Sequence, residues 1–217
     1  MGYRNAEKTK LKLIIAAEAL VATHGLAGVS AREIARQSGH RNNVVVQYHF
    51  TSIDQLFDEV VKFRMGQFEA MRARQLEDLS RQGREALSLE NLMELVCLPH
   101  LRIRNDRGRY PYAAFLCHYL PERRPFGFGW AMDAGESSTP VMQHIIRQIR
   151  ACLPHLPDMI FNRRMTNATL VFLNILRGLP DDAEGGNDLS HHPLIIDGMR
   201  QAIALLNAPW SAAPGGS

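Results

Sequence analysis

Residues 26–63 contain the pattern that most constrains the fold, two short helices joined at a glycine turn and followed by a third, longer helix. The first helix is predicted to start at Ser30, whose hydroxyl can accept from the amide three residues on while the Glu33 carboxylate reaches back to the Ser30 amide. Gly39 tolerates a positive φ, so the chain can reverse there and start a second helix near residues 42–43. This is the spacing of a helix-turn-helix motif.

In such a motif the second helix lies in the major groove of DNA with its N-terminal side chains against base edges. Arginine can pair with guanine O6 and N7, and asparagine or glutamine with adenine N7 and N6. Of the valines at 44–46, at least one must pack into the core against Ile34, and a valine on the solvent side would be available to contact a thymine methyl. The side chains of types that suit base recognition are Arg41, Asn42, Asn43 and Gln47.

Positive charge is concentrated in the N-terminal part of the chain. The whole chain carries 25 Lys and Arg against 22 Asp and Glu, a net charge of +3 that does not by itself indicate nucleic acid. Residues 1–50 contain seven Lys and Arg against three Glu, a net charge of +4, so the remaining residues carry −1. A basic N-terminal part beside a near-neutral remainder suits attraction to DNA phosphates.

Helical patterns continue along the rest of the chain, without the strict alternation of apolar and polar residues that is typical of strands. The segment before the motif, TKLKLIIAAEALVATHG, is predicted to form an amphipathic helix with Gly25 past its end. A long helix is expected from Ile53 to about Leu79, interrupted near Gly83. Further helices, separated by prolines, are expected at 89–105, 110–120, 138–153, 158–178 and 191–207.

These patterns predict an all-α protein. Residues 1–54 would form an N-terminal three-helix helix-turn-helix DNA-binding domain, and residues 55–208 a larger C-terminal helical domain, with a disordered tail at 209–217. The chain has no run of about 18 apolar residues and no secretory signal, and its three cysteines do not suggest a disulfide framework. We therefore expect a soluble, cytoplasmic protein with no membrane partner.

Catalytic and metal-binding patterns are absent or weak. The sequence has no nucleophile elbow, phosphate-binding glycine loop or zinc-protease helix, so we expect no enzyme activity and no cofactor. The string Cys-Leu-Pro-His occurs at 97–100 and again at 152–155, and thiolate and imidazole at that spacing could converge on zinc. Helix termination at the prolines explains the string at least as well, so no metal site is expected.

A joint pattern extends from about Leu13 to Phe63, roughly a quarter of the chain: a helix ending in glycine, an S-x-x-x-I-A-x-x-x-G stretch, a Y-H-F-x-S corner and a Leu-Phe pair. Its residues are Ala16, Ala17, Leu20, Gly25, Ser30, Ile34, Ala35, Gly39, Tyr48, His49, Phe50, Ser52 and Leu56. Each piece is weak, but together they are specific. The pattern resembles the N-terminal domain of the tetracycline-repressor (TetR) family of transcriptional regulators.

The resemblance implies that Tyr48 contacts a DNA phosphate from the end of the recognition helix. It also implies that the Y-H-F corner holds that helix against the fourth one. Between Gly39 and Tyr48 this sequence carries one residue more than the commonest spacing in the family. Which of the side chains at 41–43 reaches a base is therefore left open.

The sequence also departs from the family at the start of the fourth helix. Ile53 stands where many members have a lysine, so a cationic phosphate contact is absent there. Thr51 or His49 would substitute as neutral donors. The residues expected to contact DNA are Ser30, Arg32, Arg41, Asn42, Asn43, Val44, Gln47, Tyr48, His49 and Thr51.

In the TetR family the C-terminal body binds a small-molecule effector and forms a homodimer. The last two predicted helices, 158–178 and 191–207, carry so many apolar residues that they must either be buried in the monomer or face a partner. Burial within the monomer is the alternative to a dimer. A two-fold dimer would present two recognition helices to the half-sites of a pseudo-palindromic, double-stranded DNA operator.

Aromatic and methionine residues of the middle helices favour an apolar or amphipathic effector. For each residue singly, core packing is the alternative to ligand contact. The resemblance implies a ligand-responsive repressor, with a helical adaptor protein or a small-molecule enzyme as alternatives. The residues expected to contact the effector are His100, Phe115, His118, Tyr119, Trp130 and Phe172.

Overall fold

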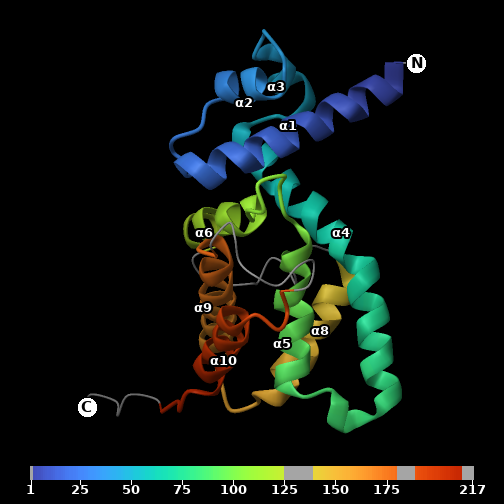
Figure 1. The fold of residues 1–217 in the computed structure, drawn as a ribbon, viewed down its shortest axis with the longest axis vertical. Helices are drawn as coiled ribbons and strands as arrows, with labels where there is room; N and C mark the ends of the chain where they lie inside the picture. The colour runs from blue at the N-terminus through green and yellow to red at the C-terminus, as the bar shows by residue number, and fades with distance from the viewer. Residues whose placement is uncertain (1, 125–138, 180–188, 212–217) are drawn as a thin grey trace.

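The computed structural model describes residues 2–124, 139–179 and 189–211, and in these ranges the chain is helical without a strand (Figure 1). The predicted all-α fold class is therefore confirmed. Two short 3-10 helices, Arg84–Ala86 and Leu98–Arg102, flank α5. The α-helices are α1 (Gly2–His24), α2 (Ala31–Gln37), α3 (Val44–His49), α4 (Ile53–Gln82), α5 (Leu89–Cys97), α6 (Pro111–Arg123), α8 (Pro140–Cys152), α9 (Asp158–Arg177) and α10 (Pro193–Asn207).

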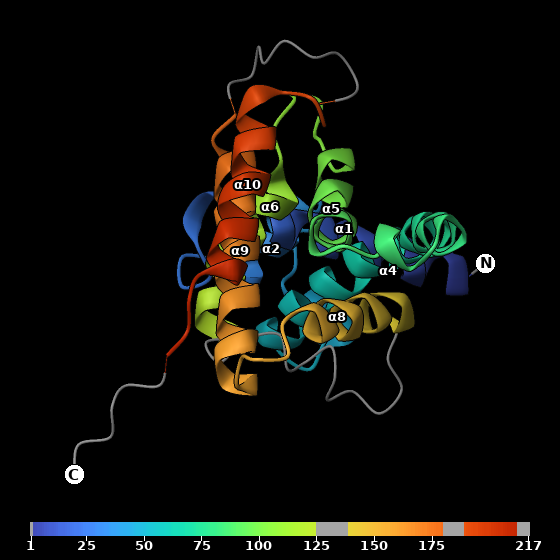
Figure 2. The same ribbon diagram turned by 90° about the horizontal axis from the view of Figure 1, so that it is seen from below.

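The helices form a head at one end of the molecule and a body at the other (Figures 1 and 2). The head consists of α1, α2 and α3, and α4 extends from it along one side of the body, where the remaining helices gather. α6 packs against α1 and joins the body to the head, while α10 lies along α9. Head and body share one continuous set of buried apolar residues. Within the described ranges, no helix is long and apolar enough to cross a bilayer.

Local interactions build the helix-turn-helix. The predicted capping box is present: Ser30 Oγ accepts from the Glu33 amide at 3.3 Å, and the Ser30 amide donates to the Glu33 carboxylate at 2.9 Å. Gly39 has a φ of +86° and reverses the chain before α3. Val46 and Ile34 are both buried where α3 packs against α2, so one of the three valines turns inward as predicted.

Most of the predicted helix ends lie within about three residues of the observed ones, with two exceptions. α1 begins at Gly2, seven residues before the predicted start at Thr9. The second exception lies in the middle of the chain. The segment expected at 89–105 is α-helical only through α5 and then continues as a 3-10 turn. Pro99 has no N–H with which to continue the α-helical hydrogen bonds, which leaves the Leu95 carbonyl free. The carbonyls of Leu95 and Val96 instead accept from the buried side chain of Arg72, at 2.9 and 3.2 Å.

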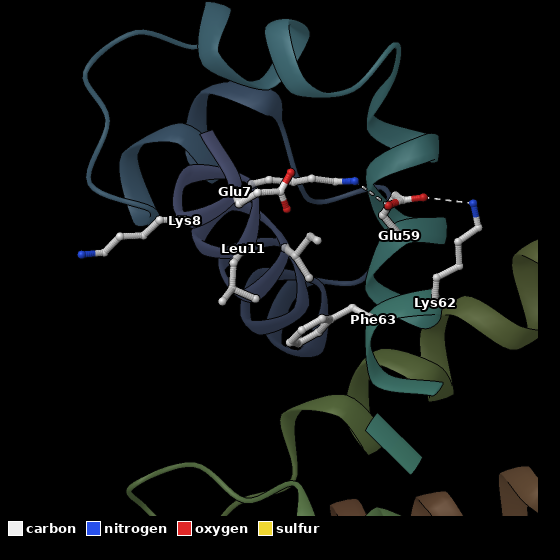
Figure 3. Close-up of a pocket in the computed structure, with 8 residues that line it drawn as sticks. Glu7, Lys8, Leu11, Glu59, Lys62 and Phe63 are labelled. Atoms are coloured by element: carbon white, nitrogen blue, oxygen red, sulfur yellow. Dashed lines mark hydrogen bonds and ion pairs between the residues drawn. The ribbon is translucent and has the colours of Figure 1, made fainter. Parts of the chain in front are cut away.

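Ion pairs hold α4 against α1. The buried Glu18 carboxylate accepts two hydrogen bonds from the Arg64 guanidinium, at 2.6 and 2.8 Å. Nearer the start of α1, Lys10 and Lys62 both pair with Glu59, at 2.9 and 3.0 Å, beside an open groove between the two helices (Figure 3). Because both oxygens of the Glu18 carboxylate accept from Arg64, the contact between Glu18 and Arg64 keeps α4 in register with α1.

Candidate functional site

One side of α3 is open to solvent. Asn43 and Gln47 lie one turn apart and are both exposed. Beside them, Val44 is 54% exposed and Tyr48 is 79% exposed, although both are large apolar or aromatic residues. This edge of α3 therefore presents amide, phenol and methyl groups together, which are the groups that recognise base edges and phosphates.

The two asparagines before α3 differ in their hydrogen bonding. Asn42 Oδ1 accepts from the Val44 amide at 2.9 Å, so this side chain satisfies the N-terminus of α3. Asn43 occupies the N-cap position but forms no side-chain cap bond. Bidentate recognition of adenine needs both the oxygen and the nitrogen of the amide, which favours Asn43 over Asn42.

The hydroxyl groups of Ser30 and Thr51 already have partners within the head. Ser30 Oγ donates to the Glu33 carboxylate at 2.7 Å. Thr51 Oγ1 and the Thr51 amide both donate to Gln55 Oε1, at 3.0 and 2.6 Å. A contact of either hydroxyl with DNA would require it to exchange its present partner.

His49 is half-buried between its neighbours in the Y-H-F corner, with ring centroids 5.0 Å from Tyr48 and 6.3 Å from Phe50. Burial, and secondarily the nearby Lys10 cation, lower the pKa of His49 below its usual 6.5. The imidazole is therefore neutral at pH 7. A phosphate contact from the neutral imidazole would be that of a neutral donor, and this contact remains a prediction.

Three exposed arginines belong to the helix-turn-helix. Arg41 precedes α3 in the turn, and Arg32 is exposed on α2. Arg36, which the sequence analysis did not include, is exposed one turn after Arg32. Arg36 could have been predicted from its spacing, because residues four apart on a helix, such as Arg32 and Arg36, lie on the same side.

A small internal cavity lies in the middle of the body. Its free volume is about 20 Å³, roughly the space of one water molecule. α4, α5, α6, α8, α9 and the 3-10 turn after α5 all contribute to its wall. The apolar part of the wall consists of Val61, Met65, Val96, Leu116, Leu120 and Met142, and the polar part of Arg72, His100, Tyr112 and Thr169.

Arg72 is fully buried in this wall. Besides its bonds to two α5 carbonyls, its Nη1 lies 3.7 Å from the Met65 sulfur, and its guanidinium stands over the Phe68 ring at 5.1 Å. Burial lowers the pKa of Arg72 to about 10, so the side chain is still a cation at pH 7. The nearby Glu69 carboxylate accepts instead from the Val141 and Met142 amides at the start of α8.

Three other polar atoms of the cavity wall are buried and have no hydrogen-bond partner within the described residues. They are His100 Nδ1, the Tyr112 hydroxyl and Thr169 Oγ1. The His100 and Tyr112 rings stack at 5.4 Å. Burial, together with the Arg72 cation, lowers the pKa of His100 to about 3, and burial raises the pKa of Tyr112. Both side chains are therefore neutral at pH 7.

The residues expected to contact an effector are distributed over more than one place. His100 lines the cavity, whereas Phe115 and Phe172 are buried in the core and do not line it. His118 faces the head: a Cβ at Gly25 would lie 3.6 Å from its Nδ1. Trp130 lies outside the described residues.

Tyr119, the remaining one, belongs to the junction between α6 and α4. Its hydroxyl donates to Asp58 at 2.5 Å, and one turn later Arg123 pairs with Asp54. Arg72, Tyr112 and Thr169 were not among the residues predicted from the sequence. For Arg72 a signal existed, because position 72 continues the buried helical spacing of Met65 and Phe68 along α4.

Within the described part of the chain, no three His, Cys, Asp or Glu side chains come together in a way that could hold a metal ion. Of the repeated Cys-Leu-Pro-His string, Cys97 is buried in α5 and Cys152 is exposed. His100 stacks on Tyr112. The prolines follow α5 and α8, so the string coincides with two helix ends.

Comparison with known proteins gives no match to a protein-family model and none to a curated protein. Among solved structures, the chain is similar to a candidate transcriptional regulator from Streptomyces coelicolor A3(2). The two chains are 18% identical, with a TM-score of 0.44. The similarity covers 93% of this chain and 99% of that chain.

Proposed function

We propose that the protein is a transcriptional regulator of the TetR type, a repressor that binds an operator as a dimer and is released by a small effector. The observation that carries the proposal is the open side of α3, where Asn43, Gln47 and Tyr48 stand clear of the core while Val46 anchors the helix. In this proposal residues 1–54 bind DNA and residues 55–208 form the effector-binding and dimerisation domain.

Asn43 and Gln47 are the proposed base readers, because their amides are exposed and lie one turn apart. Val44 is placed beside them for contact with a thymine methyl. Tyr48 would donate to a phosphate from the end of α3. Arg41 would contact either guanine or a phosphate, since its position before the helix allows both.

Two helices connect the cavity to the head, so binding of an effector in the cavity could change the position of the head. α4 carries Arg72 at the cavity and begins at Ile53 beside the recognition motif, about 28 Å away along the helix axis. α6 carries Tyr112 at the cavity, and its Tyr119 bonds to Asp58 of α4 near the head. An effector that shifts α6 against α4 would change the angle of the head, provided that it prefers the form unable to bind DNA.

The proposed dimer uses α9 and α10. Met159 of α9 and Leu194 and Ile196 of α10 are large apolar residues that remain exposed in the single chain. Apolar side chains of this kind stabilise association when a partner covers them. A two-fold axis through these helices would place two α3 helices on successive half-sites.

Fluorescence anisotropy on the DNA immediately upstream of the protein's own gene tests DNA binding, with a scrambled duplex as the control. Selective binding that weakens steeply as salt rises is expected, because arginines replace counterions on the phosphates. Weak, equal binding to both duplexes would instead favour a helical adaptor whose helix-turn-helix is only structural.

Substitutions on α3 separate phosphate contact from base reading. Tyr48→Phe should weaken binding to all sequences alike, by about 1 kcal/mol for one lost hydrogen bond. Asn43→Ala and Gln47→Ala should instead change the preferred base, with a loss of about 1–3 kcal/mol on the original operator. Gln75→Ala, at an exposed position of α4 in the body, is the control. A uniform loss in all three α3 variants would show that the base readers are assigned wrongly.

A further inference from the structure

We propose that the cavity in the body binds a small organic acid whose carboxylate pairs with Arg72 and whose apolar part lies among the aliphatic side chains of α4, α6 and α8. This inference deepens the proposed function. It rests on that function only in calling the acid the effector. Binding of the acid itself is independent of DNA.

Arg72 brings a buried positive charge to the cavity wall. Its side chain is fully buried and forms no ion pair within the described ranges. The nearby acid, Glu69, is engaged with the backbone of α8. Glu69 is close enough to favour the charged guanidinium, but within the described residues no carboxylate is bonded to it directly. A buried cation without a bonded anion is costly, so a carboxylate that enters the cavity and pairs with it would be favoured over a neutral or cationic ligand.

The wall around that cation also has hydrogen-bond donors that are not used among the residues that the structure describes. Guanidinium has five N–H groups, of which the two α5 carbonyls take two and the Met65 sulfur only a weak third. The hydroxyls of Tyr112 and Thr169 are buried in the same wall without partners. A carboxylate offers about four acceptor sites, which matches these donors. Buried hydroxyls left unpaired are otherwise rare in folded proteins.

The rest of the wall is apolar and can adapt to a ligand. Met65 and Met142 lie in it beside leucine and valine side chains. Methionine side chains adapt easily to a new neighbour. Because the free volume of about 20 Å³ holds roughly one water, a carboxylic acid must push the helices apart to enter. Such a ligand would shift α4, α6 and α8 as it binds, which is what an effector requires.

Benzoate is the probe, and it is compared with benzamide and benzylamine, which keep the ring but carry no negative charge. Binding to the full-length protein without DNA is measured by isothermal titration calorimetry and by thermal unfolding, at constant ionic strength set with sodium chloride. Acetate and butyrate extend the series to smaller acids. At least one carboxylate should bind and raise the melting temperature, and the amide and the amine should not.

Arg72→Met removes the proposed partner while keeping an unbranched side chain that suits the apolar part of the wall, and it should weaken carboxylate binding by about ten- to a hundredfold. Arg74→Met changes an exposed arginine of the same helix and should leave binding unchanged. If Arg72→Met does not fold, Thr169→Val and Tyr112→Phe decide, since each should weaken binding by about tenfold. The proposal would be overturned if Arg72→Met bound the carboxylate as tightly as the wild type. It would also be overturned if Thr169→Val and Tyr112→Phe both did so.

Anisotropy on the operator, repeated with the bound acid, separates this proposal from the proposed function. A carboxylate that binds through Arg72 but does not release DNA would support the site and refute its role as effector site. A protein that binds its operator but takes up none of the carboxylates would refute the site and leave the regulator intact.

Discussion

Burial of His100 next to the Arg72 cation makes the stability of this protein depend on pH. The pKa of the imidazole is about 3 in the folded protein, against a usual value of 6.5. Below pH 6.5 His100 binds a proton in the unfolded chain but not in the folded one. Its contribution to the free energy of unfolding is therefore complete above pH 6.5 and is lost as the pH falls. The free energy of unfolding should drop by about 2 kcal/mol between pH 7 and pH 5 from this residue. Urea unfolding at the two pH values measures the loss.

The matched variants for this prediction are two histidine-to-glutamine changes. His100→Gln should remove most of the loss between pH 7 and pH 5, whereas His155→Gln, at an exposed position, should leave it unchanged. If the two variants have the same pH dependence, His100 is not its source.

Among the elements, the turn between α2 and α3 depends on one backbone angle. Gly39 has a φ of +86°, and no atom lies within 4 Å of the place where a Cβ would stand. Gly39→Ala should therefore cost about 1–2 kcal/mol through the left-handed conformation alone. Gly66 has equally open surroundings but lies within α4, so Gly66→Ala should raise stability by about 0.5–1 kcal/mol. Chemical denaturation measures both, and changes of the same sign would contradict the role assigned to φ.

For the whole molecule, the proposed dimer can be tested with two equally exposed apolar residues. Leu194 of α10 is 47% exposed and Ile15 of α1 is 46% exposed. Leu194→Glu should dissociate the dimer, because it places a charge in an apolar interface, and should weaken operator binding as the two half-sites are no longer held together. Ile15→Glu should leave the dimer intact. Sedimentation velocity distinguishes the species, and dissociation by both variants or by neither would rule out α10 as the specific contact.

Short-range patterns in the sequence were enough to predict the helices and the recognition turn. The capping box at Ser30 and the reversal at Gly39 depend on residues within four positions of each other, and both are present. Helical periodicity likewise predicted that one valine would turn into the core on the side of Ile34, and Val46 is the buried one. The DNA contacts assigned to α3 remain a prediction, although its exposed side carries the expected residues.

The cavity could not be predicted in the same way. Arg72 and Arg74 stand two residues apart in one charged stretch, and arginine is usually a surface residue, yet the first is fully buried and the second is exposed. Helical spacing after Met65 and Phe68 was the only indication of the difference. The burial of Arg72 depends on Pro99, which ends α5 and leaves carbonyls that accept from the guanidinium.

The sequence by itself indicated most helix ends to within about three residues, because caps, turns and prolines act over a few residues, but it did not give the start of α1 or the end of α5. Only the tertiary structure decided that Arg72, His100, Tyr112 and Thr169 meet around one cavity, because these side chains come from four separate elements. Their charge and unpaired polar atoms follow from that packing, as does the placement of Tyr119 at the junction with the head. Contacts of this range depend on how whole helices pack, which no local pattern encodes.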